Sequence, residues 1–369
     1  MDKTVFDLIY LYSCALNGKK PEEKRLCDMD FDKIYTLAGR HMIKAAVGAA
    51  LEGTGYGGNC FKEAVGTAVR RTVIFEREWD EIKGRFEKEN VEYAALKGAV
   101  LKSYYGRYGM REFADHDILI KPDRACDVKA IMEDSGYTVI SYGASNHDVY
   151  QKPPFLNFEI HTALFGTQHD EAFYKYYLNI FDRLKGDGCE KRFSDEDFYL
   201  YIVCHEYKHY SNGGTGLRSL GDTYVFLKKT ALDMDYVRAE AEKLGISEFE
   251  KQNRELSQHL FDLDGLTEDE VEMLRYILSS GTYGTINHRV DNAINKNGGS
   301  KLKYMFSRFF VPFSKKNKNY ASYAGSYPFF YKHKILLPFL PFYRLIRSIK
   351  SGHFKHEAKA IKNAKKKSR

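Results

Sequence analysis

The 369-residue sequence has no long hydrophobic run and no paired cysteines. No apolar stretch approaches the roughly 18 residues that a membrane-spanning helix needs. The six cysteines are scattered without a Cys-x-x-Cys pair, which argues against a disulfide scaffold or a zinc knuckle and favours reduced thiols. The first 20 residues lack the basic start, apolar segment and cleavage site of a signal peptide and are typical of an amphipathic helix. We therefore expect a cytoplasmic protein.

The net charge of +7 is distributed unevenly along the chain. Residues 301–369 contain 18 Lys and Arg against one acid, Glu357, which leaves 39 basic and 49 acidic side chains in residues 1–300. The body is therefore acidic, and the tail is strongly basic. Such an asymmetry predicts that the tail meets an anionic partner.

Hydrophobic periodicity predicts helices on both sides of a short stretch of strands. Before the strands, helical patterns cover residues 31–51 and 62–89. The strand patterns cover residues 93–96, 115–120, 137–142 and 157–162, with a helix at 122–132 among them. Helical patterns return at 195–210, 217–229, 235–244 and 268–280. The predicted fold class is α/β in the α+β sense, with a small mixed sheet flanked by helical regions.

We divide the chain into four parts on these patterns. They are an N-terminal helical region (1–90), a core that holds the strands (91–165), a C-terminal helical region (166–300) and a basic, aromatic tail (301–369). A glycine-rich stretch at 295–301 marks the last boundary. We find no internal repeats.

Three carboxylates are placed so that they can converge. Because side chains alternate along a strand, Asp115 and Asp117 point to the same face, and Glu159 faces the same way as His161 on a later strand. Acids side by side repel each other, and a divalent cation with oxygen ligands offsets that cost. If the two strands are neighbours, the acids predict a metal site of the kind used in phosphoryl and nucleotidyl transfer.

An ordered set of motifs resembles the uncharacterised bacterial nucleotidyltransferase-like family of the polymerase-β-type superfamily. The set is Leu96-Lys97-Gly98, Tyr104 and Tyr105, Arg111, Asp115-x-Asp117, a helix that ends at Gly136-Tyr137, and Glu159-x-His161. A similar layout occurs in abortive-infection type nucleotidyltransferase toxins. The resemblance covers roughly residues 31–244, and it identifies residues 91–165 as the nucleotidyltransferase core.

The resemblance implies a reaction and a metal. A nucleoside monophosphate would pass from an NTP such as ATP to a hydroxyl acceptor (a small molecule, RNA or protein), with release of pyrophosphate. Asp115, Asp117 and Glu159 would be the catalytic residues and the ligands of Mg²⁺, in a two-metal site. Glu159, as the third acid, can also accept the proton of the attacking hydroxyl.

The resemblance also assigns the nucleotide to Lys97 and Gly98, which would line the triphosphate, and to Arg111, which would contact a phosphate. A glycine turn is where a backbone can approach a phosphate closely. The sequence departs from the superfamily at this turn, because Ala99 follows Gly98 where a serine is usual, and the gap from Gly98 to Asp115 is long.

Two other functions stay open at this point. One is a catalytically inactive fold that serves as a scaffold at the membrane surface, in a surface-polysaccharide context. The other is a toxin-like enzyme that acts on tRNA.

A second motif, His205-Glu206-Tyr207-Lys208-His209, has the form of a zinc-protease helix. We reject this interpretation because Asp222 is the only polar candidate for a third ligand nearby, and it belongs to a helix pattern of its own. Both histidines are then helix-face residues that can line the cleft opposite the carboxylates. Arg218 and Asp222, four residues apart, predict a helix ion pair or a contribution to the acceptor pocket.

The tail at 301–369 mixes cations with aromatic and aliphatic residues. Three interpretations stay open: peripheral contact with the inner face of an anionic membrane, nucleic-acid contact by stacking and phosphate binding, or packing of its aromatics on the body ahead of a solvated lysine segment.

Overall fold

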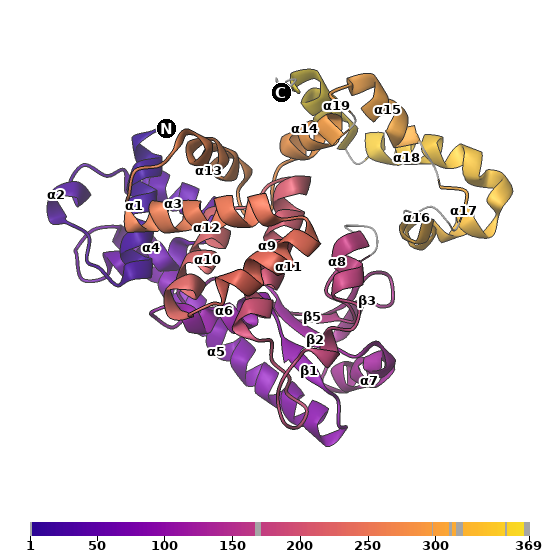
Figure 1. Cartoon of the computed structure of the whole chain (residues 1–369), viewed down its shortest axis with the longest axis horizontal. Coiled ribbons are helices and arrows are strands. Elements are labelled where there is room, and N and C mark those ends of the chain that lie inside the picture. The colour runs from indigo at the N-terminus through magenta and orange to yellow at the C-terminus, as the bar shows by residue number, and fades with distance from the viewer. Residues whose placement is uncertain are drawn as a thin grey trace.

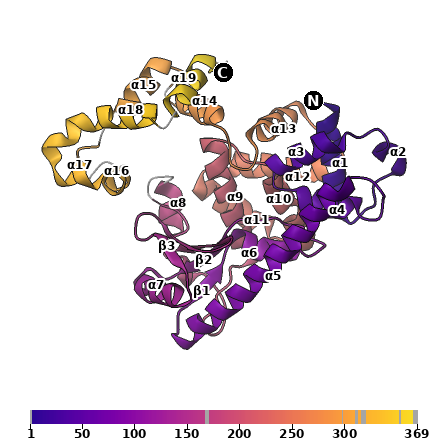
Figure 2. The ribbon, with the colours of Figure 1, turned by 180° about the vertical axis from the view of Figure 1, so that it is seen from behind.

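The computed structural model describes residues 2–166, 171–296, 298–309, 312–314, 320–350 and 353–364. It shows a helical body, a sheet along one side of it, and a C-terminal arm of helices that projects from the body (Figure 1). The view from behind shows the same arrangement (Figure 2). In this described part of the chain, no helix is long and apolar enough to cross a membrane.

Helices make up the chain before the first strand. They are α1 (Lys3–Asn17), α2 (Glu23–Leu26), α3 (Phe31–Arg40), α4 (Lys44–Leu51) and α5 (Gly58–Lys88). The prediction of one helix over residues 31–51 is wrong. The chain breaks at His41–Ile43, where Met42 takes a left-handed φ of 53° that a continuous helix does not contain.

The five strands form one mixed sheet in the order β1-β2-β5-β4-β3. They are β1 (Tyr93–Ala95), β2 (His116–Ile120), β3 (Thr138–Ser141), β4 (His147–Lys152) and β5 (Leu156–His161). Strands β2 and β5 are parallel, and the other neighbours are antiparallel. Between β1 and β3 lie α6 (Lys97–Leu101), η1 (Lys102–Tyr104), η2 (Pro122–Arg124) and α7 (Ala125–Asp134). The predicted α+β class, with a small mixed sheet flanked by helices, is confirmed.

One face of the sheet is apolar and is covered by α5 and α7. His116, Ile118 and Ile120 of β2 lie on this face, where they pack with side chains such as Phe75 of α5 and Met132 of α7. The ring of His116 stacks on Phe75, with ring centroids 6.3 Å apart. Because side chains alternate along β2, Asp117 must then point to the opposite face.

The opposite face of the sheet meets the C-terminal helical region. Its elements are α8 (Glu171–Tyr176), η3 (Ile180–Asp182), α9 (Asp195–Asn212), α10 (Leu217–Lys229), α11 (Met234–Leu244), α12 (Ser247–Asp262) and α13 (Glu268–Ser280). In both ribbon views α9 lies between the sheet and the C-terminal arm (Figures 1 and 2).

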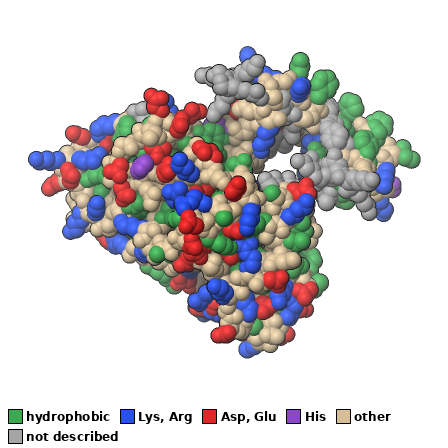
Figure 3. Space-filling model, viewed as in Figure 1, with side chains coloured by type: hydrophobic (Ala, Val, Ile, Leu, Met, Phe, Trp, Pro, Cys, Tyr) green, Lys and Arg blue, Asp and Glu red, His purple; other side chains and the backbone are tan. Residues whose placement is uncertain are grey.

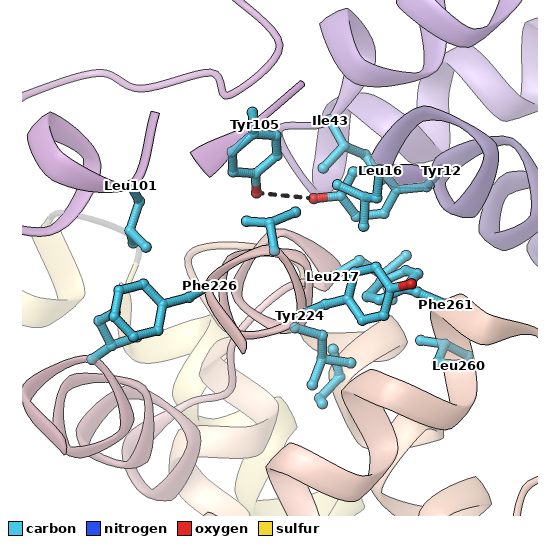
Figure 4. Close-up of a cluster of buried hydrophobic side chains, with 14 of the residues drawn as sticks. Tyr12, Leu16, Ile43, Leu101, Tyr105, Leu217, Tyr224, Phe226, Leu260 and Phe261 are labelled. Carbon is cyan, nitrogen blue, oxygen red and sulfur yellow. Dashed lines mark hydrogen bonds between the residues drawn. The ribbon is translucent and has the colours of Figure 1, made fainter. Parts of the chain in front are cut away.

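The largest core joins the two ends of the body. Tyr12 of α1 and Phe261 of α12 meet edge to face at 5.2 Å, and the hydroxyl of Tyr12 lies 3.3 Å from that of Tyr105 (Figure 4). Gly221 of α10 is required here, because an added Cβ would lie 2.0 Å from the Tyr12 hydroxyl oxygen. The first four helices therefore share a core with α9–α13, whereas α5 contributes Phe61 to that core and Phe75, Ile82 and Phe86 to the core of the sheet. The four-part division of the chain stays a prediction.

The C-terminal arm begins at α14, which packs on α9. It contains α14 (Ile286–Lys296), α15 (Lys301–Phe309), α16 (Tyr320–Ser326), α17 (Pro328–Lys332), η4 (Lys334–Phe339), α18 (Leu340–Lys350) and α19 (His353–Asn363). Two small clusters hold it together: one is formed by Tyr331, Leu337 and Leu340, and the other includes Tyr304 and Ala360.

Candidate active site

Asp117 and Glu159 lie directly opposite each other on neighbouring strands. Strand β5 pairs with β2 in parallel, and the register places Asp117 beside Glu159. In a parallel pair, residues in register project to the same face, so both carboxylates point away from the α5 layer. The strands that carry Asp117 and Glu159 are therefore neighbours, as the prediction of a metal site required.

Asp117 is the most tightly held of the acids. Its side chain is 3% exposed, Lys97 Nζ donates to Oδ1 at 2.6 Å, and His161 Nε2 lies 2.8 Å from the same oxygen. Burial alone would raise the pKa of Asp117, but Lys97 and His161 hold it far below its usual value. Asp117 is thus a fixed negative charge at the centre of the site.

Lys97 reaches Asp117 from the first residue of α6. Its backbone has a positive φ of 42°, which costs a residue with a Cβ about 1 kcal/mol or more. The chain is held there because the Leu96 amide donates to the Asp117 carbonyl at 3.0 Å. This strained turn aims the ammonium group at the carboxylate, and strain of this kind concentrates at functional sites.

Asp115 lies one residue before β2, at its entry, and is partly buried. Burial and the negative charge of Asp117 raise the pKa of Asp115 to about 6, with a further contribution from Glu159. Asp115 therefore lies close enough to both acids to be repelled by them, and its carboxylate form is destabilised.

Two histidines complete the cluster around Glu159. The carboxylate oxygen Oε2 of Glu159 lies 3.7 Å from His161 Nε2 and 3.9 Å from His147 Nε2. Among the described residues these three form the one set of potential metal ligands whose donor atoms all lie within 4.8 Å of one another. The predicted trio of Asp115, Asp117 and Glu159 is not such a set among the described residues, and Lys97 and His161 both contact Asp117.

His147 was not predicted as a site residue because β4 was not predicted as a strand. That strand forms a hairpin with β5, in which His147 pairs with His161. The sequence HDVYQK shows no apolar alternation, because one of its two buried residues, Asp148, is charged and the half-buried residue between them, Val149, is apolar.

Helix α9 forms the opposite wall of the site. Tyr201, His205 and Lys208 follow each other at spacings of four and three, which places them on one helix face. Burial and the positive charge of Lys97 lower the pKa of Lys208 to about 8 and that of His205 well below its usual value. Asp117 and Glu159 act on Lys208 in the opposite direction, so α9 presents cationic and polar groups to the carboxylates.

The zinc-protease interpretation of this helix is excluded by the direction of Glu206. Asn253 Nδ2 donates to its Oε2 at 2.7 Å, and the Thr223 hydroxyl donates to the same oxygen at 3.3 Å, so the carboxylate faces α10 and α12. The two histidine Nε2 atoms lie 3.3 Å apart. A carboxylate that is bound by Asn253 and Thr223 between α10 and α12 is not available as a general base for a metal between the two histidines.

Arg111 links the site to α10. Its Nε and Nη2 each donate to Asp222 at 2.8 Å, and the Tyr105 hydroxyl donates to Asp222 Oδ1 at 2.8 Å. The predicted ion pair between Arg218 and Asp222 is not formed, because Arg218 Nη1 donates to the Glu112 carbonyl at 2.9 Å. The guanidinium of Arg111 also lies against Gly98, where an added Cβ would be 2.4 Å from Nη1.

A family model described as uncharacterised nucleotidyltransferase matches residues 28–262. The chain belongs to this family. Comparison with curated proteins gives no match. Comparison with solved structures gives none either. The matched range contains the sheet, the carboxylates and the α9 wall, so family membership supports a general nucleotidyltransferase activity.

Nucleotidyltransferases generally use divalent metals, and the residues of this family member fit such an ion. Asp115, Asp117 and Glu159 offer carboxylate oxygens that repel each other, and His147 and His161 offer imidazole nitrogens beside Glu159. Burial and the nearby His161 lower the pKa of His147, which favours the neutral form that binds metals. Carboxylates suit Mg²⁺, whereas added imidazoles also suit Mn²⁺.

A cavity of about 410 Å³ in this nucleotidyltransferase lies beside the chain segment that precedes Asp115. It lies between α3, α4, α5 and residues 111–114, and its polar lining includes Lys44, Glu63, Thr67 and Arg71. A cavity of this size, with positively and negatively charged side chains in its wall, can take a small polar molecule.

Proposed function

We propose that the chain is a cytoplasmic, Mg²⁺-dependent enzyme that transfers a nucleoside monophosphate from an NTP such as ATP to a hydroxyl acceptor and releases pyrophosphate. The observation that carries this proposal is the register of Asp117 on β2 with Glu159 on the parallel strand β5. Asp115 lies at the entry to β2. The divalent ions would supply charge neutralisation on the attacking and leaving oxygens.

The acids divide the work between binding and proton transfer. Asp115 and Asp117 would hold the metal, and Glu159 would complete the cluster. Burial alone would raise the pKa of Glu159, but the contact with His161 lowers it below its usual value. The carboxylate of Glu159 is therefore charged at neutral pH. A charged carboxylate at this position can accept the proton of an attacking hydroxyl.

Phosphate binding falls to the cations on both walls. Lys97 lies at the first residue of α6, next to Gly98, and Lys208 faces it from α9. A triphosphate between them would be held from two sides, and its negative charge would favour the protonated form of Lys208. Arg111 is bidentate to Asp222, so we assign it a positioning role behind Gly98 in place of direct phosphate contact.

The acceptor would approach through the cavity beside residues 111–114. Its wall carries Lys44 and Arg71 as well as the hydroxyl of Thr67, which suits a polar or anionic acceptor. Ala114 lines the cavity and Asp115 follows it in the chain, so the cavity ends near the entry to β2.

The test uses purified protein, Mg²⁺, cell extract and two labelled nucleotides. Label in the α-phosphate should appear on an acceptor, whereas label in the γ-phosphate should leave as pyrophosphate. Asp117→Asn should lower the transfer rate at least about 10³-fold. Asp134→Asn, which changes an exposed acid on α7, should transfer at the wild-type rate.

Fractionation of the extract identifies the acceptor class. Label that vanishes with RNase would indicate an enzyme acting on RNA, as in the toxin-like alternative. Transfer by Asp117→Asn at the wild-type rate, or transfer of γ-label to the acceptor, would refute the assignment. An inactive scaffold would bind nucleotide without releasing pyrophosphate in any fraction.

A further inference from the structure

The C-terminal arm exposes a regular apolar stripe along η4 and α18. Phe339, Phe342, Ile346 and Ile349 follow each other at spacings of three, four and three residues, which places them on one helix face. Their exposed fractions are 61%, 60%, 55% and 55%. An amphipathic helix normally buries such a stripe against its own protein, but these four side chains are exposed. Hydrophobic side chains are visible at the surface of the arm (Figure 3).

A second exposed stripe lies on α15. Leu302, Met305 and Phe306 are 68%, 45% and 76% exposed, and their spacing again places them on one face. Ile335 adds to the apolar surface of the arm, with an exposed fraction of 89%. The two cores of the arm are formed by other residues, among them Tyr304, Tyr331, Leu337 and Leu340.

Exposed cations lie among the stripe residues in the sequence. Lys303, Lys332, Lys334, Arg347 and Lys350 are all exposed. The one acid after residue 300 is Glu357, and it accepts a hydrogen bond from the Tyr304 hydroxyl at 2.7 Å within the arm. The arm therefore combines an outward apolar surface with positive charge.

We propose that this arm is a peripheral anchor for an anionic lipid surface. The stripes on α15 and α18 would enter the headgroup and acyl boundary, and the lysines and arginines beside them would meet anionic headgroups. The inference goes beyond the proposed transfer reaction, because it concerns where the enzyme works. It fits an acceptor that is itself carried at a membrane surface.

Two other occupants fit the surface less well. Nucleic acid would use flat rings for stacking. Phe306, Phe339 and Phe342 offer such rings, but Leu302, Ile335, Ile346 and Ile349 in the same surface are aliphatic and offer bases no stacking surface. A second copy of the chain would bring an equally basic arm against the first, and like charges at an interface oppose association.

The test is cosedimentation of the full chain with vesicles, without nucleotide, so its outcome is independent of the transfer reaction. Wild type should bind vesicles that contain phosphatidylglycerol, and it should bind phosphatidylcholine vesicles at least about tenfold more weakly. The double variant Phe342→Ser with Ile346→Ser should lose about tenfold or more in partitioning. Raising the salt concentration to about 1 M should also release the protein.

The matched control is Ile140→Ser on β3, because Ile140 is 55% exposed, as Ile346 is, but lies outside the arm. This variant should bind vesicles as wild type does. Equal binding by the double variant, or no binding by wild type, would overturn the proposal. Binding of RNA by wild type that the double variant loses, without vesicle binding, would assign the surface to nucleic acid. A wild-type dimer in sedimentation that the double variant abolishes would assign it to a second copy.

Discussion

The negative charge of Asp115 lowers the stability of the folded protein when no metal is bound. Burial and the charge of Asp117 raise the pKa of its carboxyl group to about 6, well above the 3.8 of an unperturbed Asp. The unfolded chain therefore gives up this proton more readily than the folded chain does. Above about pH 4 the folded state loses stability relative to the unfolded state, and the loss is complete above about pH 6.

We therefore expect Asp115→Asn to stabilise the metal-free protein by about 2 kcal/mol at pH 7 while it abolishes nucleotidyl transfer. The measurement is the free energy of unfolding in urea for both proteins, with a chelator present, at pH 7 and pH 4. The difference should shrink at the lower pH, where Asp115 is neutral in the folded state. A variant less stable than wild type at pH 7 would show that Asp115 has a structural role.

His41 makes the opposite contribution to the pH dependence of stability. It is fully buried, its Nδ1 accepts a hydrogen bond from the Leu217 amide at 3.2 Å, and burial together with the charge of Arg40 lowers its pKa to about 4. Because the folded pKa lies below the unfolded value of 6.5, stability is present at neutral pH and is lost as the pH falls.

When the pH falls from 7 to 5, protonation of His41 should lower the free energy of unfolding of the wild-type protein by about 2 kcal/mol. His41→Gln keeps an acceptor for Leu217 without a titrating ring, so its stability should change less over this range. His333→Gln, which removes an exposed histidine, should follow wild type. Identical pH profiles for wild type and His41→Gln would contradict the account.

At the scale of elements, the sequence predicted the strands that carry apolar alternation. Strand β2 could be found from its apolar run Ile118–Ile120, and β5 because Ile160 alternates with the polar Glu159 and His161. Strand β4 was missed because it has few apolar residues, and His147 was missed with it. The break at Met42 was also missed, since helical periodicity continues across a single left-handed residue.

Long-range partners could not be predicted from local patterns. Asp222 lies four residues from Arg218 in α10, which suggests a local pair, yet it binds Arg111, more than 100 residues away. The fixed geometry of a guanidinium favours a bidentate carboxylate, and only the folded chain brings the two together. In the same way, the cations on α9 became part of the site only through tertiary packing.

The Arg111–Asp222 pair ties the loop before β2 to α10. Both side chains are at most 7% exposed, so Asp222→Asn leaves a buried guanidinium without its counter-charge and should cost about 3 kcal/mol of unfolding free energy. Urea unfolding measures this loss. Asp235→Asn, which affects an exposed i,i+3 pair, should have no measurable effect. Equal stability of the two variants would show that the buried pair does not hold the loop.

At the scale of the whole molecule, three parts have separate tasks. The sheet supplies the acids, and the shared core of the N- and C-terminal helices holds α9 opposite them. The arm after α14 leaves its apolar stripes outside both cores. This arrangement predicts that changes in the arm alter the location of the enzyme and leave the chemistry of the site unchanged.

The central claim is that the register-matched acids form a divalent-metal site for an NTP. The most direct test is Mn²⁺ binding, followed by electron paramagnetic resonance in the presence of α,β-methylene ATP, because it needs no acceptor. Wild type and Asp134→Asn should bind Mn²⁺ equally, and Asp117→Asn and Glu159→Gln should each bind at least about tenfold more weakly. Wild-type affinity in both site variants, or no Mn²⁺ binding by wild type, would contradict the claim.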